Sequence, residues 1–465
     1  MKNSKKTLVL AASILATCGA LVSCSNGDDN RAAVEAAVAD AQTLTRDELM
    51  KKAAEELGTN DFKFIATTSR GGKDAVKEGF VNELKKYNPN ISAAQIKYDS
   101  TVDGKIYTTL TNEIQNGVKD GYNAAIVQDG YQLQRFGRDT GYFINYVPKE
   151  WKDDAQTDKA NDADPMSLQY NFKTWMVNNK NGDTVIDNVW DITAKKYKGK
   201  LDTMDPRNEN VNMDWLIMLT QDKWCDVLKT TFEDASNDAK SEIDLTKYAS
   251  YGEKQKYAYA FIDGFLSNAV FYEDDGKAIN NLVATPGHIG WIVYSKLLTV
   301  SETAAISKKN IVVAPLGATN ADGSTIGDSA MKGFGGFMYK HYLTVMPTAT
   351  YPYTACAFLN FLSTTKLGYS KWASDVGDYP TMPSINVDRT KNGHGSLVEE
   401  TKDGKTSLVF KQSNDGENLF PCLNDPAGAW WNDSAKGNAV IETPSFIAPA
   451  YPTVKTFIDK ALANK

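Results

Sequence analysis

The stretch FKFIATTSRGGKDAVKEGFVNELKKY, residues 62–87, decides the expected fold. It opens with a short apolar run, residues 62–67, which is too brief for a helix and suits a buried strand. Gly71 and Gly72 favour a turn, because glycine adopts backbone conformations that other residues resist. Apolar side chains then recur at helical spacing, at Val76, Phe80, Leu84 and Tyr87. A strand, a glycine turn and a helix together predict half of a parallel β-α-β unit.

The same alternation continues along the chain. Residues 95–99 and 124–127 are predicted strands, and a helix with Ile106 and Leu110 on one face lies between them. Alternating strands and helices are typical of an α/β fold, with a mostly parallel sheet covered by helices on both faces. Such sheets bind ligands outside the carboxyl ends of their strands. The predicted ligand residues at this edge are Ser69, Arg70, Asp103, Asp129 and Tyr131.

A second set of elements repeats the pattern. Residues 168–178 form a predicted strand that carries the chain away, and residues 199–204 form another. The turn DPRNE follows at residues 205–209, and Asn210 then suits the start of a helix. The unpaired N–H groups at a helix start attract polar and anionic groups. Two such helix starts that face each other would hold a polar solute, so we predict ligand contacts from Asp205, Arg207 and Asn208.

Aromatic and charged side chains supply the remaining candidates. Aromatic rings stack on sugars or close over cations, which makes Tyr170, Trp291 and Tyr379 predicted ligands, although packing in the core is the alternative for each. Arginines in turns before helices suit a carboxylate or a phosphate, or else stay solvated. Aspartates in such turns accept from hydroxyls or a cation, or cap helices. Because the candidates include both arginines and aspartates, they do not predict whether the solute is positive, negative or neutral.

The N-terminus predicts export. Lys2, Lys5 and Lys6 precede an apolar run at residues 7–22, which is the pattern of a secretory signal peptide over residues 1–23. The tetrapeptide LVSC that follows resembles the bacterial lipobox, whose cysteine receives lipid and becomes the new N-terminus. This resemblance implies that Cys24 is the lipid attachment site. Residues 24–44, which open with a short polar stretch, are the predicted lipidated cysteine and tether. The remaining cysteines, Cys225, Cys356 and Cys422, are scattered; they allow one disulfide at most, and we predict buried free thiols.

Composition narrows the function classes. A chain of 465 residues that is 42% hydrophobic can bury a large core and suggests two domains. The net charge is −7, and it becomes −10 without the signal peptide, which argues against nucleic acid as a partner. Three dispersed histidines indicate no metal cluster. The sequence has no G-x-S-x-G, H-E-x-x-H or Walker motif, so we expect no enzyme activity, no cofactor and no resident metal.

The order of motifs resembles the extracytoplasmic solute-binding proteins of ABC importers, in the two-lobed class with a discontinuous first domain. The matching segments are the opening helix ELMKKA at 48–53, the entry to the second lobe WDIT at 190–193 with KYKGKL at 196–201, the turn DP at 205–206, the helix start YPYTACAF at 351–358 and the turn GDYPT at 377–381. Iron-binding members carry an adjacent tyrosine pair, whereas Pro352 separates Tyr351 from Tyr353 here, which weighs against iron.

This resemblance implies a two-lobed, type II-like periplasmic-binding-protein fold with a cleft between the lobes. The implied organisation is a first lobe at 45–167 and 315–386, a second lobe at 168–314, hinges at 164–170 and 314–317, and a C-terminal extension at 387–465 that we assign to neither lobe. The implied function is that of a monomeric lipoprotein outside the cytoplasmic membrane, which captures a small polar solute and delivers it to the permease subunits of an ABC importer. The solute classes left open are a sugar, a polyamine, an organic anion or a metal complex. The alternatives are a secreted lipoprotein hydrolase acting on carbohydrate through a carboxylate pair, and a non-catalytic surface lipoprotein.

Overall fold

The computed structural model describes residues 27–118, 120–181, 184, 186–298, 311–313, 331–373, 378–385, 395–402, 405–412, 439–463 and 465. The predicted signal peptide, the lipid attachment site Cys24, the second predicted hinge and Cys422 lie outside these residues. Within the described residues, no helix combines the length and the apolar character that crossing a membrane requires.

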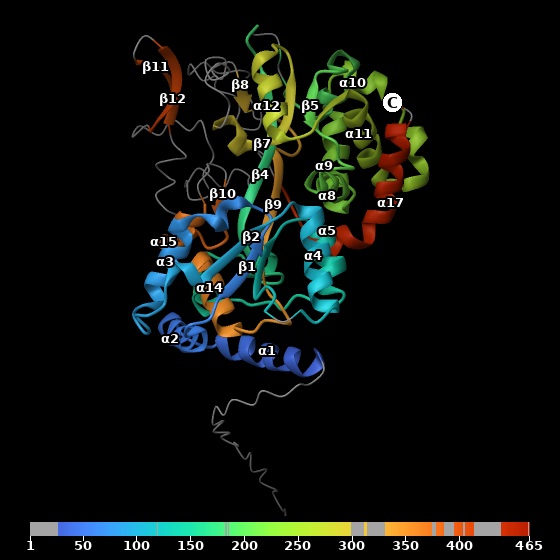
Figure 1. Cartoon of the computed structure of the whole chain (residues 1–465). Helices are drawn as coiled ribbons and strands as arrows, with labels where there is room; N and C mark the ends of the chain where they lie inside the picture. The colour runs from blue at the N-terminus through green and yellow to red at the C-terminus, as the bar shows by residue number, and fades with distance from the viewer. Residues whose placement is uncertain are drawn as a thin grey trace, which may run out of the picture.

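One mixed sheet of eleven strands runs through the whole molecule, and its main path is β2-β1-β3-β9-β4-β7-β5-β6 (Figure 1). Three parallel strands lie at one end: β1 (Phe62–Ala66), β2 (Ile96–Ser100) and β3 (Ala124–Val127). Three more lie at the other end: β5 (Leu201–Met204), β6 (Ala269–Tyr272) and β7 (Ile289–Val293). The long antiparallel strands β4 (Ser167–Asn178) and β9 (Gly336–Val345) join the two sets. Each parallel set with its helices is called a lobe below.

Three short strands complete this sheet. β8 (Ile311–Val313) and β10 (Asp378–Pro380) pair with β4, and β13 (Val440–Ile441) pairs with β9. A separate two-stranded sheet consists of β11 (Gly395–Lys402) and β12 (Lys405–Gln412). The segment predicted as a turn at residues 377–381 forms a strand at residues 378–380, because β10 pairs in antiparallel register with β4.

Helices cover both faces of the sheet in each lobe, as the alternation of strands and helices predicts. The first lobe carries α1 (Gly27–Ala41), α2 (Arg46–Leu57), α3 (Asp74–Leu84), α4 (Asp103–Gln115), α14 (Pro352–Thr364) and α15 (Lys366–Trp372). The second lobe carries α8 (Asn210–Met218), α9 (Asp222–Glu233), α10 (Asn237–Glu242), α11 (Gln255–Asn268), α12 (Asp275–Ala284) and α17 (Pro444–Ala463). Shorter pieces are η1 (Ser69–Gly72), η2 (Ala93–Gln95), α5 (Gly130–Gln132), η3 (Leu133–Arg138), α6 (Lys149–Asp153), α7 (Lys159–Asp162), η4 (Val189–Thr193), η5 (Lys195–Tyr197), η6 (Leu245–Tyr251), η7 (Tyr294–Leu298) and η10 (Pro383–Ile385).

The hydrophobic core follows from the two-residue period of the strands. In β1, Phe64 packs with α2, α3 and α14 on one face, while Ile65 packs with α4 on the other. In β4, Trp175 packs with α8, α9 and α11, while Met176 packs with α12. The sheet therefore has a core layer on each face in both lobes. In sheets covered on both faces, ligands bind outside the carboxyl ends of the strands.

Both ends of the described chain pack onto the lobes. Residues expected to begin as a tether are helical from Gly27, and Val34 and Val38 of α1 are buried in the first lobe. The C-terminal extension contributes α17 to the second lobe, where Ile447 and Ile458 enter the core. In Figure 1, α17 runs from the junction along the second lobe beside α8 and α11. Strand β9 also begins in the second lobe, because Phe337 packs in that core.

Candidate functional site

Two strand ends converge at the middle of β9, where the lobes meet. β3 pairs antiparallel with β9, and its last residue lies opposite Tyr342. β13 pairs parallel with β9, and its last residue lies opposite Met338. The two strands therefore point toward each other along the same partner, and the residues that follow them are brought together. These residues are Gln128 and Asp129 after β3 and Glu442 after β13.

Asp129 is completely buried and connects the lobes. Its backbone has a φ of 74°, a left-handed conformation that aspartate tolerates better than most residues do. One carboxylate oxygen accepts from the backbone N–H of Gln132 at 2.9 Å and so caps α5. The other accepts from the Asn210 side-chain amide at 2.6 Å, at the start of α8 in the second lobe. The start of α8, the predicted second-lobe helix start, therefore contacts the first lobe at α5, whereas the helix start predicted in the first lobe follows the turn at residues 69–72.

Asp214, on the next turn of α8, makes the second connection. Its carboxylate accepts from the backbone N–H of Tyr131 at 3.3 Å. Its side chain is fully buried, and its Oδ1 atom has no hydrogen-bond donor among the described residues. The ring of Tyr131 stacks on Tyr451 of α17, with centroids 3.6 Å apart and planes 9° from parallel. The C-terminal helix therefore contacts this junction directly.

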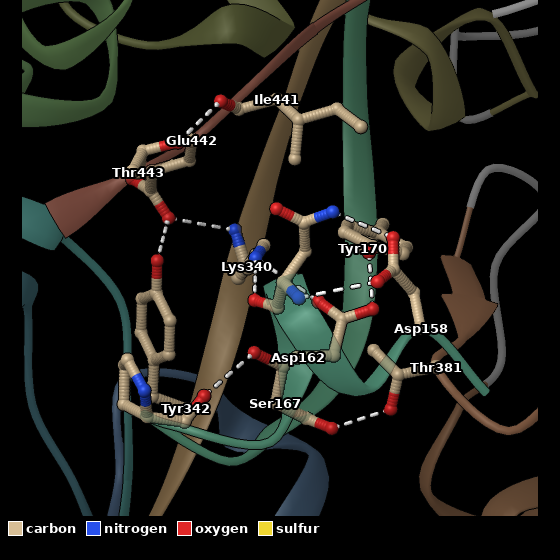
Figure 2. Close-up of polar contacts among 12 residues, drawn as sticks. Asp158, Asp162, Ser167, Tyr170, Lys340, Tyr342, Thr381, Ile441, Glu442 and Thr443 are labelled. Atoms are coloured by element: carbon tan, nitrogen blue, oxygen red, sulfur yellow. Dashed lines mark hydrogen bonds and ion pairs between the residues drawn. The ribbon is translucent and has the colours of Figure 1, made fainter. Parts of the chain in front are cut away.

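Glu442 supplies a third buried carboxylate (Figure 2). It accepts from the Tyr342 hydroxyl at 2.6 Å and from the backbone N–H of Lys340 at 3.0 Å, both on β9. A longer contact of 3.3 Å joins it to the backbone N–H of Gly130 at the start of α5. Asp129, Asn210, Asp214 and Glu442 are together called the junction cluster below.

Burial dominates the electrostatics of the junction cluster. It raises the pKa of Asp129, Asp214 and Glu442, because a carboxylate loses its hydration when it leaves water. Like charge adds to this effect, since Asp129 and Glu442 each raise the pKa of Asp214 further. The cluster therefore favours bound protons, or a cation, over three negative charges.

Two buried lysines flank the junction cluster on the crossing strands. Lys173 of β4 lies 3.4 Å from Asp275 and 3.8 Å from Glu209, the residue that precedes α8. Lys340 of β9 forms an ion pair of 3.0 Å with Asp162, whose carboxylate also accepts from the Tyr170 hydroxyl (Figure 2). Both ammonium groups are therefore engaged by other carboxylates.

The structure places the predicted first-lobe residues along one edge of the sheet. Ala66 of β1 lies opposite both Ser100 of β2 and Ile126 of β3, so the three strands end at the same level. Ser69 is exposed at the start of η1, and Arg70 follows it. Asp103 is the first residue of α4 rather than part of a preceding turn. The side chains of Arg70 and Asp103 lie outside the described part of the structure.

The predicted second-lobe residues form a self-contained turn after β5. Arg207 pairs with Asp205, with Nη2 and Oδ2 only 2.5 Å apart. Its Nε contacts both oxygens of the same carboxylate, at 3.0 and 3.1 Å. The arginine therefore forks onto a neighbour in its own turn, while Asn208 remains exposed beside it. The start of α8, a few residues later, is what reaches the first lobe.

The predicted aromatic residues lie in packed surroundings. Trp291 is fully buried, with its ring 4.0 Å from that of Trp215 and 4.4 Å from that of Trp175. This environment fits the alternative given for Trp291, which is packing in the core. The same core contains Trp215, which lies on the apolar stripe of its helix. Tyr170 and Tyr379 are buried opposite each other on β4 and β10. Tyr131 is the predicted aromatic residue that lies at the junction cluster.

The described residues provide no group of three or more histidine, cysteine or acidic side chains arranged to hold a metal.

Tyr351 and Tyr353 lie at the opposite end of the first lobe from the junction. The backbone N–H of Tyr351 donates to Asn123, just before β3 begins, at 2.8 Å. The Tyr353 hydroxyl donates to Asp40 of α1 at 2.9 Å. Cys225 and Cys356 are buried free thiols, as predicted.

Sequence reasoning missed three of the four residues of the junction cluster as ligand candidates. Asn210 was expected only to start a helix, and it is the first residue of α8. Asp214 is an acid within the apolar run of residues 211–219, a signal that a buried carboxylate needs a partner. Glu442 lies in the segment that the sequence assigned to neither lobe, after a strand of only two residues.

Solved structures share this fold. Iron-bound HitA from Pseudomonas aeruginosa matches with a TM-score of 0.52 at 10% identity, covering 86% of this chain and 99% of that chain. An ABC transporter structure from Clostridium perfringens matches with a TM-score of 0.52 at 11% identity, over 86% and 100% of the two chains. The substrate-binding protein of an ABC transporter from Agrobacterium tumefaciens gives 0.50 at 12% identity, over 87% and 95%. The chain therefore has the mixed α/β fold of periplasmic binding proteins over most of its length.

Comparison at the level of sequence adds no assignment. No protein-family description matches the chain, and no curated protein matches it either. At identities near a tenth, the structural matches establish the fold, and function has to be argued from the site.

Proposed function

We propose that this chain is the solute-binding component of an ABC importer. It captures a small polar solute between its two lobes outside the cytoplasmic membrane and delivers that solute to the membrane subunits. One observation carries the proposal: strand carboxyl ends from both lobes meet at one junction, where polar side chains of each lobe contact the other. Ligands of open α/β sheets bind at such strand ends.

The connection between the lobes supports the same function. Outside the C-terminal segment, β4 and β9 are the long strands that pass from one lobe to the other. A pair of crossing strands permits hinge motion through a few residues at element ends, while each lobe keeps its own core. Two of the structural matches are described as an ABC transporter and as the substrate-binding protein of one, which agrees with this proposal.

The proposed binding surface combines predicted and newly located residues. Asp129 and Tyr131 are central, because they contact the second lobe. Ser69, Arg70 and Asp103 lie on the same sheet edge and are proposed to bind the solute from the first lobe, while Asp205, Arg207 and Asn208 are proposed to do so from the second. Tyr170 and Tyr379 remain proposals that require rearrangement of β10, and Trp291 is better explained by packing.

A thermal-shift screen tests the function directly. The purified protein is heated with sugars, amines, carboxylates, phosphonates and metal ions, and each mixture is then analysed for chemical change. Stabilisation by one class of compound without turnover is the expected result, because a ligand that binds only the folded state raises its melting temperature. Release of product would favour the hydrolase alternative instead, and no stabilisation by any class would contradict the proposal.

The proposed lipid anchor needs a separate test, because Cys24 lies outside the described residues. Cys24→Ser should move the protein from the membrane fraction to the soluble fraction and leave solute binding unchanged, because an acyl chain acts only through membrane affinity. Cys18→Ser, in the same leader, is the matched control and should stay membrane-bound. Membrane retention of the Cys24→Ser protein would contradict the anchor.

A further inference from the structure

The carboxylates at the lobe junction outnumber the cations that balance them. Lys173 is shared by Glu209 and Asp275, and the Lys340 ammonium pairs with Asp162. Lys340 donates to Glu442 through its backbone N–H, while its ammonium group pairs with Asp162 instead. Among the described residues, the three carboxylates of the junction cluster therefore form no ion pair of 4 Å or less. Three adjacent buried acids without a counter-ion are unusual, because an unpaired buried charge is costly.

Asp214 shows where a positive group is missing. Its Oδ1 atom is buried and has no donor in the described structure, while its carboxylate accepts from the backbone N–H of Tyr131 at 3.3 Å and also interacts with the backbone N–H of Gly130. Asp129, by comparison, accepts at least two well-placed hydrogen bonds, and Glu442 accepts from a hydroxyl at 2.6 Å. Buried polar atoms in native proteins nearly always have a partner, so an orphaned carboxylate oxygen at a strand-end junction indicates a donor supplied from outside.

The aromatic surroundings suit the same kind of donor. The ring of Tyr131 stacks in parallel on that of Tyr451, and the backbone N–H of Tyr131 contacts the Asp214 carboxylate at 3.3 Å. An aromatic face attracts a cation and also packs against the methylene groups of an organic amine. Carboxylates with neighbouring aromatic faces therefore fit a molecule that carries both N–H donors and an apolar body.

We propose that the captured solute is an organic cation whose N–H groups bind Asp129, Asp214 and Glu442. The inference rests on the proposed function and names the chemical class of its solute. An ammonium group offers three donors, which matches a cluster of acceptors on several elements. A bare metal ion fits less well, because the described acidic groups lack a metal-binding arrangement. Because Glu442 precedes α17, the C-terminal segment takes part in choosing the charge of the solute.

The first experiment compares probes of different charge on the full-length Cys24→Ser chain. Putrescine and arginine provide N–H cations, choline provides a cation without N–H donors, and glucose and citrate are neutral and anionic. Calorimetric titration should show binding of an N–H cation and at least about tenfold weaker binding of choline, because a hydrogen bond to a charged group contributes that much. Preferential binding of glucose or citrate would overturn the inference and keep the proposed function. Binding by no probe, in this panel or the wider screen, would reject both.

The second experiment removes one charge while keeping the shape. Asp214→Asn should weaken binding of the N–H cation by about tenfold or more and leave the melting temperature of the solute-free protein equal or higher, because it relieves like charge. A purely structural role for Asp214 would instead lower the melting temperature and leave affinity unchanged. Glu253→Gln is the matched control, since that carboxylate is 90% exposed on the surface of the second lobe. If Asp214→Asn does not fold, Glu442→Gln carries the same expectation, and unchanged affinity in the folded variant would overturn the inference.

Discussion

Glu56 shows how a single carboxylate can link stability to pH. It lies on α2, and its oxygens accept from the Thr354 backbone N–H at 2.7 Å, the Thr354 hydroxyl at 2.8 Å and the Tyr353 backbone N–H at 3.2 Å. It thereby satisfies free N–H groups at the start of α14. Burial nevertheless raises the pKa of Glu56 to about 7. The folded state therefore holds this proton more tightly than the unfolded chain does.

The first prediction concerns this proton. Since the folded-state pKa of Glu56 lies above the unfolded value, its contribution to stability is lost as pH rises from about 5 to 8. Glu56→Gln should remove this part of the pH dependence. Over that range, the free energy of unfolding of wild type should therefore fall by roughly 2–3 kcal/mol more than that of the variant. Urea denaturation at pH 5 and pH 8 measures the difference. Glu55→Gln, on the exposed face of α2, should behave as wild type, and equal slopes for all three proteins would contradict the assignment.

Two glycines of the first lobe give opposite expectations for the same substitution. A Cβ added to Gly368 of α15 would lie 2.0 Å from the Phe361 carbonyl oxygen, which is backbone and cannot rotate away. Gly104, near the start of α4, has no heavy atom within 4 Å of such a Cβ. Gly368→Ala should therefore destabilise the protein by about 3 kcal/mol, and Gly104→Ala should be neutral or stabilise it by up to about 1 kcal/mol. Chemical denaturation of both variants checks the pair, and similar effects at the two positions would contradict this geometry.

At the scale of elements, the sequence predicted those whose pattern is long and regular. The strands near residues 62–67, 124–127 and 168–178 occur as β1, β3 and β4. The pattern T-x-x-E at residues 45–48 is typical of a helix start, and Thr45 forms a complete capping box with Glu48 on α2. These elements were predictable because apolar periodicity and cap chemistry are local properties of the chain. The same reasoning could not find β13, since two residues carry no period.

The C-terminal helix is longer than local sequence rules suggest. Pro449 and Pro452 disfavour a helix interior, so helical periodicity predicts a helix only near residues 454–462. The structure extends α17 from Pro444 through both prolines, and its buried face packs Ile447, Val454 and Ile458 on the second lobe. Tertiary packing therefore overrides the local preference of the prolines.

The third prediction tests this packing. Ile458 is fully buried in the core of the second lobe. Ile458→Ala should therefore lower the free energy of unfolding by about 2–4 kcal/mol. Lys460, two residues further on, is exposed, and Lys460→Ala should change stability by less than about 0.5 kcal/mol. Thermal or urea unfolding gives both values. If the two variants were equally stable, α17 would not be an integral part of the second lobe.

At the scale of the whole molecule, the sequence predicted the architecture better than the site. Alternating strands and helices led to two lobes with strand ends that face each other, and Asp129 was correctly placed at such an end. Its partners were not predictable, because Asn210 lies 81 residues away and Glu442 lies 312 residues from Gly130. Pairing at these separations depends on how β3 and β13 align on β9, which no local pattern records.

The last prediction concerns the balance between lobes in contact and lobes apart. The Asn210 amide donates to the Asp129 carboxylate at 2.6 Å, and this bond joins the two lobes directly. A hydrogen bond to a charged acceptor contributes about 1.5–3 kcal/mol, so Asn210→Ala should shift the solute-free equilibrium at least about tenfold toward separated lobes. Small-angle X-ray scattering should then report a larger radius of gyration at unchanged secondary structure. Asn237→Ala, at the exposed start of α10, is the control and should scatter as wild type does.

A solute that stabilises the protein in the screen should return the Asn210→Ala variant to the compact form, because it binds that form preferentially. A radius that Asn210→Ala leaves unchanged would mean that other contacts, such as the packing of α17 against α5 and α8, hold the lobes together.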